Sequence, residues 1–460
     1  MLTSFILFLL VSSCARAHPA NELAKIFDEN IYARLWRTAL TGPPQSGSES
    51  GWPHYTQGAY NNTPASSISA GVYVNAQASG WTSGFFPDAL WQTYRRRRDL
   101  SSHSYAKEPS LDEWLSMAQA WTEPLKSNTN LTSTHDLGFL AKPFESALQI
   151  TGTDEYLPEL RNMSINLANR FVPGAGIIRS WNCGDYVSLR CSHEDSVLVI
   201  IDNMMNLALL ARSASDYTHN TTLLDIAKSH ADKTMVNHVR PDGSSFHVCD
   251  YSATTGDVYL CRTAQGLADD STWSRGQAWG IYGFAEFYSL TKDVAYLETA
   301  IRMANWFIEN LPEDSLPFWD FNAEQIPNET PRDSSAAAIA ASGLLLLQEQ
   351  IRLSGYQGTK YDYHAEAVRL LKASIKFAFA GAISFSDMTE LGAETFIDTP
   401  ANTPETKGFE GILLHATSNN NPKVPSRNFD TGLSYGDFYL VEAGNRLLEF
   451  KAENTLVDAL

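Results

Sequence analysis

The sequence predicts an all-α fold, an (α/α)6 barrel in which six helical hairpins close into two concentric rings. About twelve segments of helical length alternate with loops along the whole chain. One segment, Ala336–Leu347, is almost wholly Ala, Ile, Leu, Ser and Gly, as a helix buried on all sides would be. Another, Thr221–His238, carries charges on one face, as an outer helix would. A twelve-helix solenoid is the competing arrangement, but no fixed sequence period supports it.

The periodicity and the capping residues place each expected helix. The expected helices are Glu22–Leu40, Thr82–Arg97, Leu111–Leu125, Asp136–Ile150, Asp154–Phe171, Asp195–Ser213, Thr221–His238, Ser274–Leu290, Asp293–Asn310, Ser334–Leu353, Tyr361–Phe377 and Leu433–Phe450. Short strand pairs are expected within Gly176–Ser192 and Ser245–Arg262, which are rich in aromatic and β-branched residues.

The N-terminus predicts export. The apolar run Leu2–Leu10 leads to Ala15-Arg16-Ala17, which is typical of a signal peptide cut after Ala17, so residues 1–17 form the leader and 18–460 a single domain. We therefore expect a secreted, extracellular protein. No later apolar run is long enough to span a bilayer. The net charge of -18 argues against nucleic acid and anionic membranes as partners. A monomer is expected.

Removal of the leader also removes Cys14 and leaves four cysteines. Local disulfides Cys183–Cys191 and Cys249–Cys261 are the simplest of the three possible pairings, because the spacing fits neither a metal knuckle nor a redox motif. Five sequons are expected to carry N-linked glycans, although a proline follows the last of them directly. They begin at Asn61, Asn130, Asn162, Asn220 and Asn328.

Two carboxylates attract attention. Asp136, in Thr134–Phe139, opens an expected helix, where a helix cap is the simplest interpretation of an acidic residue. Asp202 follows five apolar residues and precedes two methionines, so its carboxylate has no polar face to take it outward. A buried carboxyl has a raised pKa and can act as a general acid near neutral pH. A structural Asp202, hydrogen-bonded by Asn203 or Asn206, remains an equal alternative.

Aromatic residues and one arginine accompany these carboxylates. A loop rich in Gly, Ser, Asn and aromatics precedes Trp81, a composition that suits a sugar site or the ordinary packing of a loop on a helix. Farther on, Arg275 lies between Trp273 and Trp279 at a helix start. A guanidinium can bind a carboxylate while an indole stacks on a sugar ring. Glycines 276, 280 and 283 permit close helix packing.

Five motifs, in this order, resemble the unsaturated glucuronyl hydrolases, glycoside hydrolase family 88. They are WTSGFFP, THDLGF, IDNMMN, the segment from Trp273 to Tyr282, and DSSAAA, and they extend from Trp81 to Gly343. The resemblance implies an (α/α)6 barrel and a reaction that needs no metal or other cofactor. It also implies an oligosaccharide substrate that ends in an unsaturated uronate.

The resemblance assigns roles to residues of this chain. It makes Asp202 the principal acid and base and Asp136 its partner carboxylate. The sugar-stacking and polar contacts that it implies are Trp81, Phe85, His135, Trp181, His247, Gln265, Trp273, Arg275 and Trp279. Ala264 departs from the family pattern, because some relatives have a second His at this position. The resemblance therefore does not define which residues contact the sugar near position 264.

The reaction implied is hydration of a C4=C5 enol ether at the non-reducing end of a lyase-generated oligosaccharide, which releases unsaturated glucuronic acid. An unsaturated rhamnogalacturonyl hydrolase or a conventional inverting glycosidase on the same barrel is the nearest alternative. A glycan-binding protein without activity is a third, against which the retention of both Asp136 and Asp202 argues.

Overall fold

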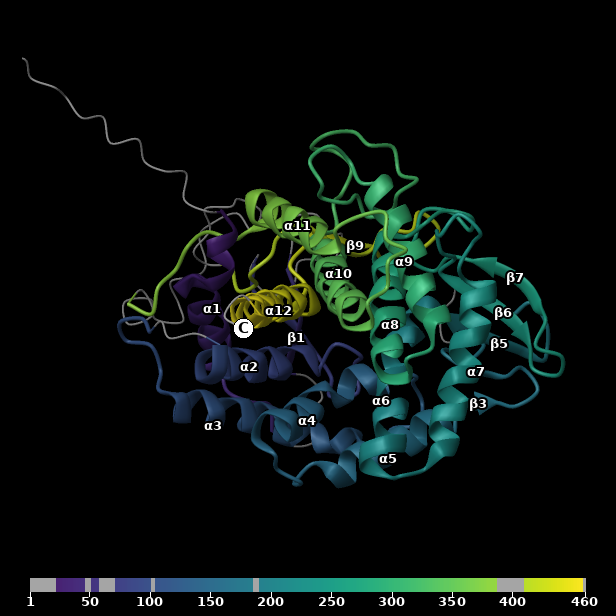
Figure 1. The fold of residues 1–460 in the computed structure, drawn as a ribbon, viewed down its shortest axis with the longest axis horizontal. Helices are drawn as coiled ribbons and strands as arrows, with labels where there is room; N and C mark the ends of the chain where they lie inside the picture. Colours follow the sequence, from purple (N-terminus) through teal and green to yellow (C-terminus); the bar gives the residue numbers. More distant parts are fainter. Residues whose placement is uncertain are drawn as a thin grey trace, which may run out of the picture.

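The computed structural model describes residues 22–45, 51–57, 71–100, 104–184, 190–386 and 409–457. The expected leader, with Cys14, and the sequon at Asn61 lie outside these residues. Twelve α-helices in the described part of the chain form two rings, and the last helix packs against one of the first, so the rings close (Figure 1). The predicted (α/α)6 barrel is therefore confirmed.

Six helices form the inner ring, each packed on the next. They are α2 (Phe85–Arg95), α4 (Leu137–Thr151), α6 (Leu207–Arg212), α8 (Ser274–Thr291), α10 (Ser334–Ser354) and α12 (Ser434–Val457). Six more lie outside them, namely α1 (Glu29–Ala39), α3 (Leu111–Thr122), α5 (Leu157–Ala168), α7 (Thr221–Asn237), α9 (Val294–Glu309) and α11 (Tyr363–Ala378). Every residue from 334 to 347 in α10 is buried, whereas α7 buries only one face. The inner and outer assignments of these two helices are thus confirmed.

Glycine allows two of the inner segments to approach closely. A Cβ atom on Gly283 of α8 would lie 2.6 Å from Cβ of Met204, and one on Gly138 of α4 would lie 2.6 Å from Cα of Asn206. Both distances are far inside van der Waals contact, so a larger residue at either position would push the 3-10 helix Ile201–Asn206 away from the barrel. That 3-10 helix carries Asp202.

One predicted helix is wrong. The segment expected to be the helix Asp195–Ser213 consists of strand β5 (Ser196–Ile200), the 3-10 helix Ile201–Asn206, the short α6, and one π-helical turn, Ser213–Tyr217. A short run that is buried on every side has no periodicity to separate a strand from a helix, and its valines and isoleucines favour the strand. Asp202 therefore lies in the first turn of a 3-10 helix that follows a strand directly, and is not embedded in an apolar helix.

Short antiparallel sheets cover one end of the barrel. β5 pairs with β6 (Val248–Ser252), which pairs with β7 (Val258–Arg262), and β3 (Phe171–Val172) pairs with β4 (Ile177–Ile178). The pair β6–β7 lies within Ser245–Arg262, where strands were predicted. Of the described strands only β4 lies within Gly176–Ser192, since its partner β3 precedes that region. Two further hairpins were not predicted. They are β1 (Trp52–Thr56) with β2 (Tyr73–Ala76), and β8 (Ala416–Asn419) with β9 (Asn428–Thr431).

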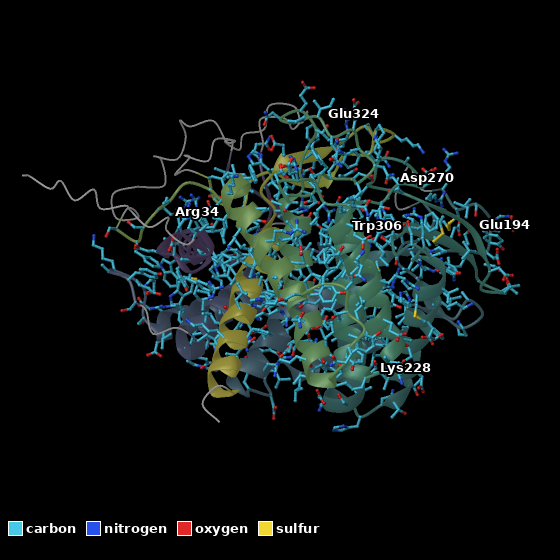
Figure 2. All side chains as sticks on the ribbon, turned by 45° about the horizontal axis from the view of Figure 1, so that its top comes forward. Arg34, Glu194, Lys228, Asp270, Trp306 and Glu324 are labelled. Carbon is cyan, nitrogen blue, oxygen red and sulfur yellow. A yellow bond between two sulfur atoms is a disulfide. The ribbon has the colours of Figure 1, made fainter. Side chains whose placement is uncertain are left out.

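Both predicted disulfides form. Cys249 and Cys261 lie opposite each other on β6 and β7, and Cys183 joins Cys191 beside this sheet. Figure 2 shows the sulfur atoms on the same side of the molecule as Glu194. The four sequon asparagines within the described residues, Asn130, Asn162, Asn220 and Asn328, are all exposed, and their glycosylation stays a prediction. No helix among the described residues is long and apolar enough to cross a membrane.

Candidate active site

The N-terminal ends of the inner helices meet at one end of the barrel, which we call the mouth. Residues at the starts of four different inner helices make contacts there, in two pairs. Arg275 in the first turn of α8 lies 3.6 Å from the carboxylate of Asp333, which caps α10. The rings of Trp81, just before α2, and Tyr435, in the first turn of α12, lie 4.9 Å apart. The parallel inner helices therefore bring distant sequence motifs into one site.

Asp202 occupies the centre of the mouth and is 8% exposed. The pKa of its carboxyl is raised to about 7. Burial is the main cause and the nearby charge of Asp136 adds to it, while the charge of Arg275 and the Trp279 indole oppose the shift. Its Oδ2 atom has no hydrogen-bond partner among the described residues and lies 3.8 Å from Nε2 of His247. A carboxyl with this pKa is protonated in a large fraction of molecules at neutral pH and can donate a proton.

Asp136 is held in place by its neighbours rather than by capping its helix. It precedes α4 but makes no side-chain cap hydrogen bond. The Thr134 hydroxyl donates to Oδ2 of Asp136 at 2.7 Å, and Nε2 of His135 lies 3.4 Å from Oδ1. His135 is completely buried, which lowers its pKa, so its ring is neutral. The capping interpretation of Asp136 is therefore not supported, and its carboxylate remains available to the mouth.

His247 turns an N–H toward Asp202. The backbone N–H of Ala264 donates to Nδ1 of His247 at 3.2 Å, and a backbone amide can only donate. Nδ1 is therefore the acceptor of this ring and Nε2 carries the hydrogen. Burial, aided by the positive charge of Arg275, holds the pKa of His247 well below its usual range, so the ring is neutral.

Ala264 contributes to the site through its backbone. In addition to its N–H bond to His247, its carbonyl oxygen accepts a hydrogen bond from Nδ2 of Asn421 at 3.0 Å. Gln265, next to it, is half-buried, and its Oε1 atom has no partner among the described residues. The departure from the family pattern at position 264 thus leaves the backbone contacts intact and an adjacent amide free for a ligand.

Arg275 does not lie where it would contact a substrate directly, although the resemblance implied such a contact. Its side chain is completely buried, its Nη1 donates to the carbonyl of Thr417, and its Nη2 donates to that of Ser418 at 2.6 Å. Its guanidinium also lies 4.3 Å from the centre of the Trp273 ring. Arg275 therefore fastens the β8–β9 hairpin to the mouth, and its charge lowers the pKa of Asp202.

The predicted stacking aromatics fall into two layers. Trp81 and Trp181 are partly exposed, and the Trp181 ring meets His247 edge-on at 6.1 Å. Trp273 is nearly buried and lies 4.4 Å from the His247 ring. Phe85 and Trp279 are completely buried, and both contact Phe139 beneath the mouth. The outer indoles are placed to meet a sugar, whereas Phe85 and Trp279 support the floor of the site.

Tyr435 is a site residue that the sequence analysis did not single out. It is buried, its hydroxyl has no partner among the described residues, and its ring lies 5.3 Å from the Arg275 guanidinium. The segment Ser434-Tyr435-Gly436-Asp437 opens the last inner helix, as Trp81 precedes α2 and Trp273 precedes α8. An aromatic residue near the start of α2 and of α8 was the signal that could have identified it.

Comparison with known proteins gives this site a family. No family model matches the chain. An unsaturated glucuronyl hydrolase of Formosa agariphila is 32% identical over 397 residues, 85% of this chain and 86% of that protein. One of Bacillus sp. GL1 is 35% identical over 293 residues, 63% of this chain and 72% of that protein.

Solved structures agree with the sequence relatives. The crystal structure of an unsaturated glucuronyl hydrolase specific for heparin superposes with a TM-score of 0.73 at 30% identity, over 94% of this chain and 98% of that one. The structure of the Bacillus sp. GL1 enzyme also gives a TM-score of 0.73, at 25% identity, over 92% of this chain and 96% of that one. The chain belongs to the unsaturated glucuronyl hydrolases, glycoside hydrolase family 88.

Proposed function

We propose that Asp202 is the proton donor of a vinyl ether hydration that removes 4,5-unsaturated glucuronic acid from the non-reducing end of lyase-generated oligosaccharides. The observation that carries the proposal is the buried carboxyl of Asp202, whose pKa is raised to about 7, at the centre of an aromatic mouth. General acid catalysis is most efficient when the pKa of the acid lies near the working pH.

The reaction needs one proton donor that also serves as a base. Protonated Asp202 gives its proton to C4, the π electrons form the new C4–H bond, and positive charge develops at C5 and the ring oxygen. A water molecule then adds at C5 and returns a proton to the Asp202 carboxylate. The resulting hemiketal opens and expels the rest of the oligosaccharide. Because the anomeric carbon is never attacked, the separation of the two carboxylates does not set the stereochemistry.

Asp136 and His247 support this acid in different ways. The charge of Asp136 helps keep Asp202 protonated and stabilises the positive charge that develops at C5. The Nε2–H of His247 points at Asp202 and can hydrogen-bond to it or to the substrate beside it. Trp81 and Trp181, which are partly exposed, supply flat apolar faces for the sugar rings.

The proposal is tested by ultraviolet absorbance. Purified protein is incubated with unsaturated disaccharides from chondroitin, hyaluronan, heparin, gellan, xanthan and ulvan, and the near-ultraviolet band of the conjugated enol carboxylate is followed. We expect at least one of these substrates to lose the band in proportion to enzyme. Persistence of the band with all of them would refute the proposal, and the ranking of rates identifies the parent polysaccharide.

We also propose that the chain acts outside the cell as a glycoprotein. Three observations support export, namely the apolar N-terminus with its cleavage motif, two disulfides, and exposed sequon asparagines. The test is mass spectrometry of the protein from culture medium, before and after enzymatic deglycosylation. Recovery only inside cells, or a mature N-terminus at Met1, would contradict it.

A further inference from the structure

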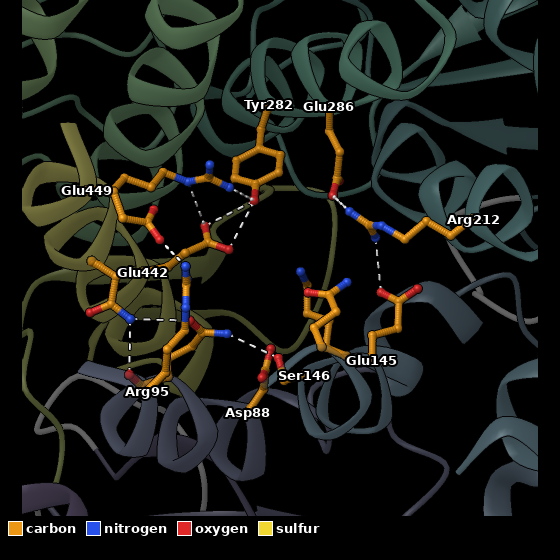
Figure 3. A pocket seen from close by; sticks show the side chains of 14 residues that line it. Asp88, Arg95, Glu145, Ser146, Arg212, Tyr282, Glu286, Glu442 and Glu449 are labelled. Carbon is orange, nitrogen blue, oxygen red and sulfur yellow. Dashed lines mark hydrogen bonds and ion pairs between the residues drawn. The ribbon is translucent and has the colours of Figure 1, made fainter. Parts of the chain in front are cut away.

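A polar cavity lies at the opposite end of the barrel, which we call the base. It has a volume of about 230 Å³, and Figure 3 shows fourteen side chains around it. These belong to α2, α4, α6, α8 and α12 and include Arg95, Gln149, Arg212, Glu286 and Glu449 from the C-terminal parts of these helices. Gln149 is exposed, so the cavity can be reached from solvent. None of these residues takes part in the proposed reaction.

Most of the charged groups that line the base are already paired. Arg212 donates to Glu145 at 3.1 Å and to Glu286 at 2.6 Å. Arg446 lies 3.8 Å from Glu442 and donates to the Tyr282 hydroxyl, and Arg95 is bound by Glu449. These pairs hold five inner helices around the cavity. Most of the charged side chains that line it therefore already have a partner of opposite charge.

Two lining groups lack such partners. Asp88 is 2% exposed, and its Oδ1 atom has no hydrogen-bond partner in the described part of the chain. The Lys142 ammonium lies 5.1 Å from the centre of the Phe438 ring and 5.7 Å from that of Tyr439, and it makes no hydrogen bond or ion-pair contact with a described residue. An unsatisfied buried polar atom costs about 1–3 kcal/mol, so Asp88 favours a molecule in the cavity that bonds to its Oδ1 atom. The ammonium of Lys142, which is half-buried, can bond to the same molecule.

The charges of the walls decide which molecule fits. Five carboxylates and four basic groups line the cavity. An anion would be repelled by the carboxylates and by the negative C-terminal ends of the helix dipoles. A cation would be repelled by Lys142 and three arginines. A hydroxyl group carries no charge and both donates and accepts, so it can accept from Lys142 and donate to Asp88. The volume lies below the roughly 300 Å³ at which drug-sized pockets begin, which limits the ligand to a single small ring.

We propose that the base cavity is a second ligand site, which binds a small neutral polyhydroxy compound, a polyol or a single sugar unit, between Lys142 and Asp88. Neither the hydration reaction nor the mouth residues enter into this proposal. It therefore stands or falls separately from the proposed function.

Saturation-transfer difference NMR with D-glucose and myo-inositol tests the site on the full chain. We expect saturable binding of at least one probe in the millimolar range, about 4 kcal/mol of binding free energy. Lys142→Met, which keeps the length of the side chain but removes the ammonium, should weaken binding at least tenfold. Acetate and ethylammonium, which carry one charge each, should bind at least tenfold more weakly than the better neutral probe.

Two control variants separate the base from other places where a sugar could bind. Trp181→Ala at the mouth and Lys228→Met on the outer helix α7 (Lys228 is labelled in Figure 2) should leave the affinity for the probes unchanged. If Lys142→Met does not fold, Asp88→Asn takes its place, and the same loss of affinity is expected. Absence of saturable binding would show that the cavity holds only water. Loss of affinity in Trp181→Ala but not in the base variants would overturn the proposal as well.

Discussion

The two ends of the barrel each hold a buried aspartate whose pKa is raised to about 7, yet only one of them is equipped for the hydration reaction. At the mouth, the charge of Arg275 opposes the effect of burial on the pKa of Asp202, and the charge of Asp136 adds to it. At the base, the charge of Lys142 likewise opposes the effect of burial on the pKa of Asp88, and the charge of Glu442 adds to it. A raised pKa therefore reports burial, and the surrounding groups decide whether a carboxyl can serve as a catalytic acid.

The surroundings differ because the inner helices are parallel. At the mouth, Trp81, Trp273 and Tyr435 stand at the starts of α2, α8 and α12. Their last turns at the base carry alternating acids and arginines that pair across the axis. Between the two ends, a layer that contains Phe139, Trp279 and Tyr439 closes the barrel.

The largest expected effect comes from the same substitution made in the two aspartates, one at each end of the barrel. Asp202→Asn should lower kcat/KM by at least about 10³-fold, since a general acid contributes roughly 10²–10⁴-fold and this residue also acts as the base. Asp88→Asn, the same change at the base, should lower it by less than about tenfold. Initial rates of absorbance loss measure both. Similar losses in the two variants would remove the distinction between the two ends.

Substitution of the partner carboxylate should have a smaller effect of a distinct kind. Asp136→Asn should lower kcat about 10²-fold, because the developing positive charge loses a stabilising neighbour. Since Asp136 raises the pKa of Asp202, the alkaline limb of the pH–rate profile should also move to lower pH. A profile of unchanged shape would mean that the two carboxylates are not coupled.

Substitution of Arg275 should move the alkaline limb of the pH–rate profile in the opposite direction, to higher pH. Because its charge lowers the pKa of Asp202, Arg275→Met should shift the alkaline limb to higher pH, while KM rises as the β8–β9 hairpin loses its two hydrogen bonds. Arg275→Lys restores the charge and should return the limb toward its original position without fully restoring KM. A limb that stays in place in Arg275→Met would contradict the electrostatic role.

The smallest effect concerns stability at the base. The folded pKa of Asp88 is about 7, above its ordinary value of 3.8, so the folded state binds more protons between these values and is destabilised as pH rises through this window. Asp88→Asn removes that titration. Relative to the original chain, the variant should gain stability from pH 4 to pH 7, by up to about 4 kcal/mol, and then level off. Denaturant midpoints at several pH values measure the difference, and a constant difference would contradict a raised pKa.

Much of the fold and of the site could be predicted from the sequence, since helices of the inner and outer rings differ in their apolar pattern and the mouth residues fall in five ordered motifs. The strand before Asp202 could not, because a fully buried run has no periodicity. The part played by Arg275 could not either, since the carbonyls it binds belong to residues 417 and 418, more than 140 positions away. Tyr435 was missed for a related reason, because its partners come from other helices.

The most direct test compares two disaccharides that differ only in the C4=C5 bond of the terminal uronate. The chain should consume the unsaturated disaccharide with loss of its near-ultraviolet band and should leave the saturated one uncleaved, because only an enol ether can accept the proton of Asp202. Asp202→Asn should consume neither. Cleavage of the saturated disaccharide at a comparable rate, or unchanged consumption of the unsaturated one by Asp202→Asn, would contradict hydration by Asp202.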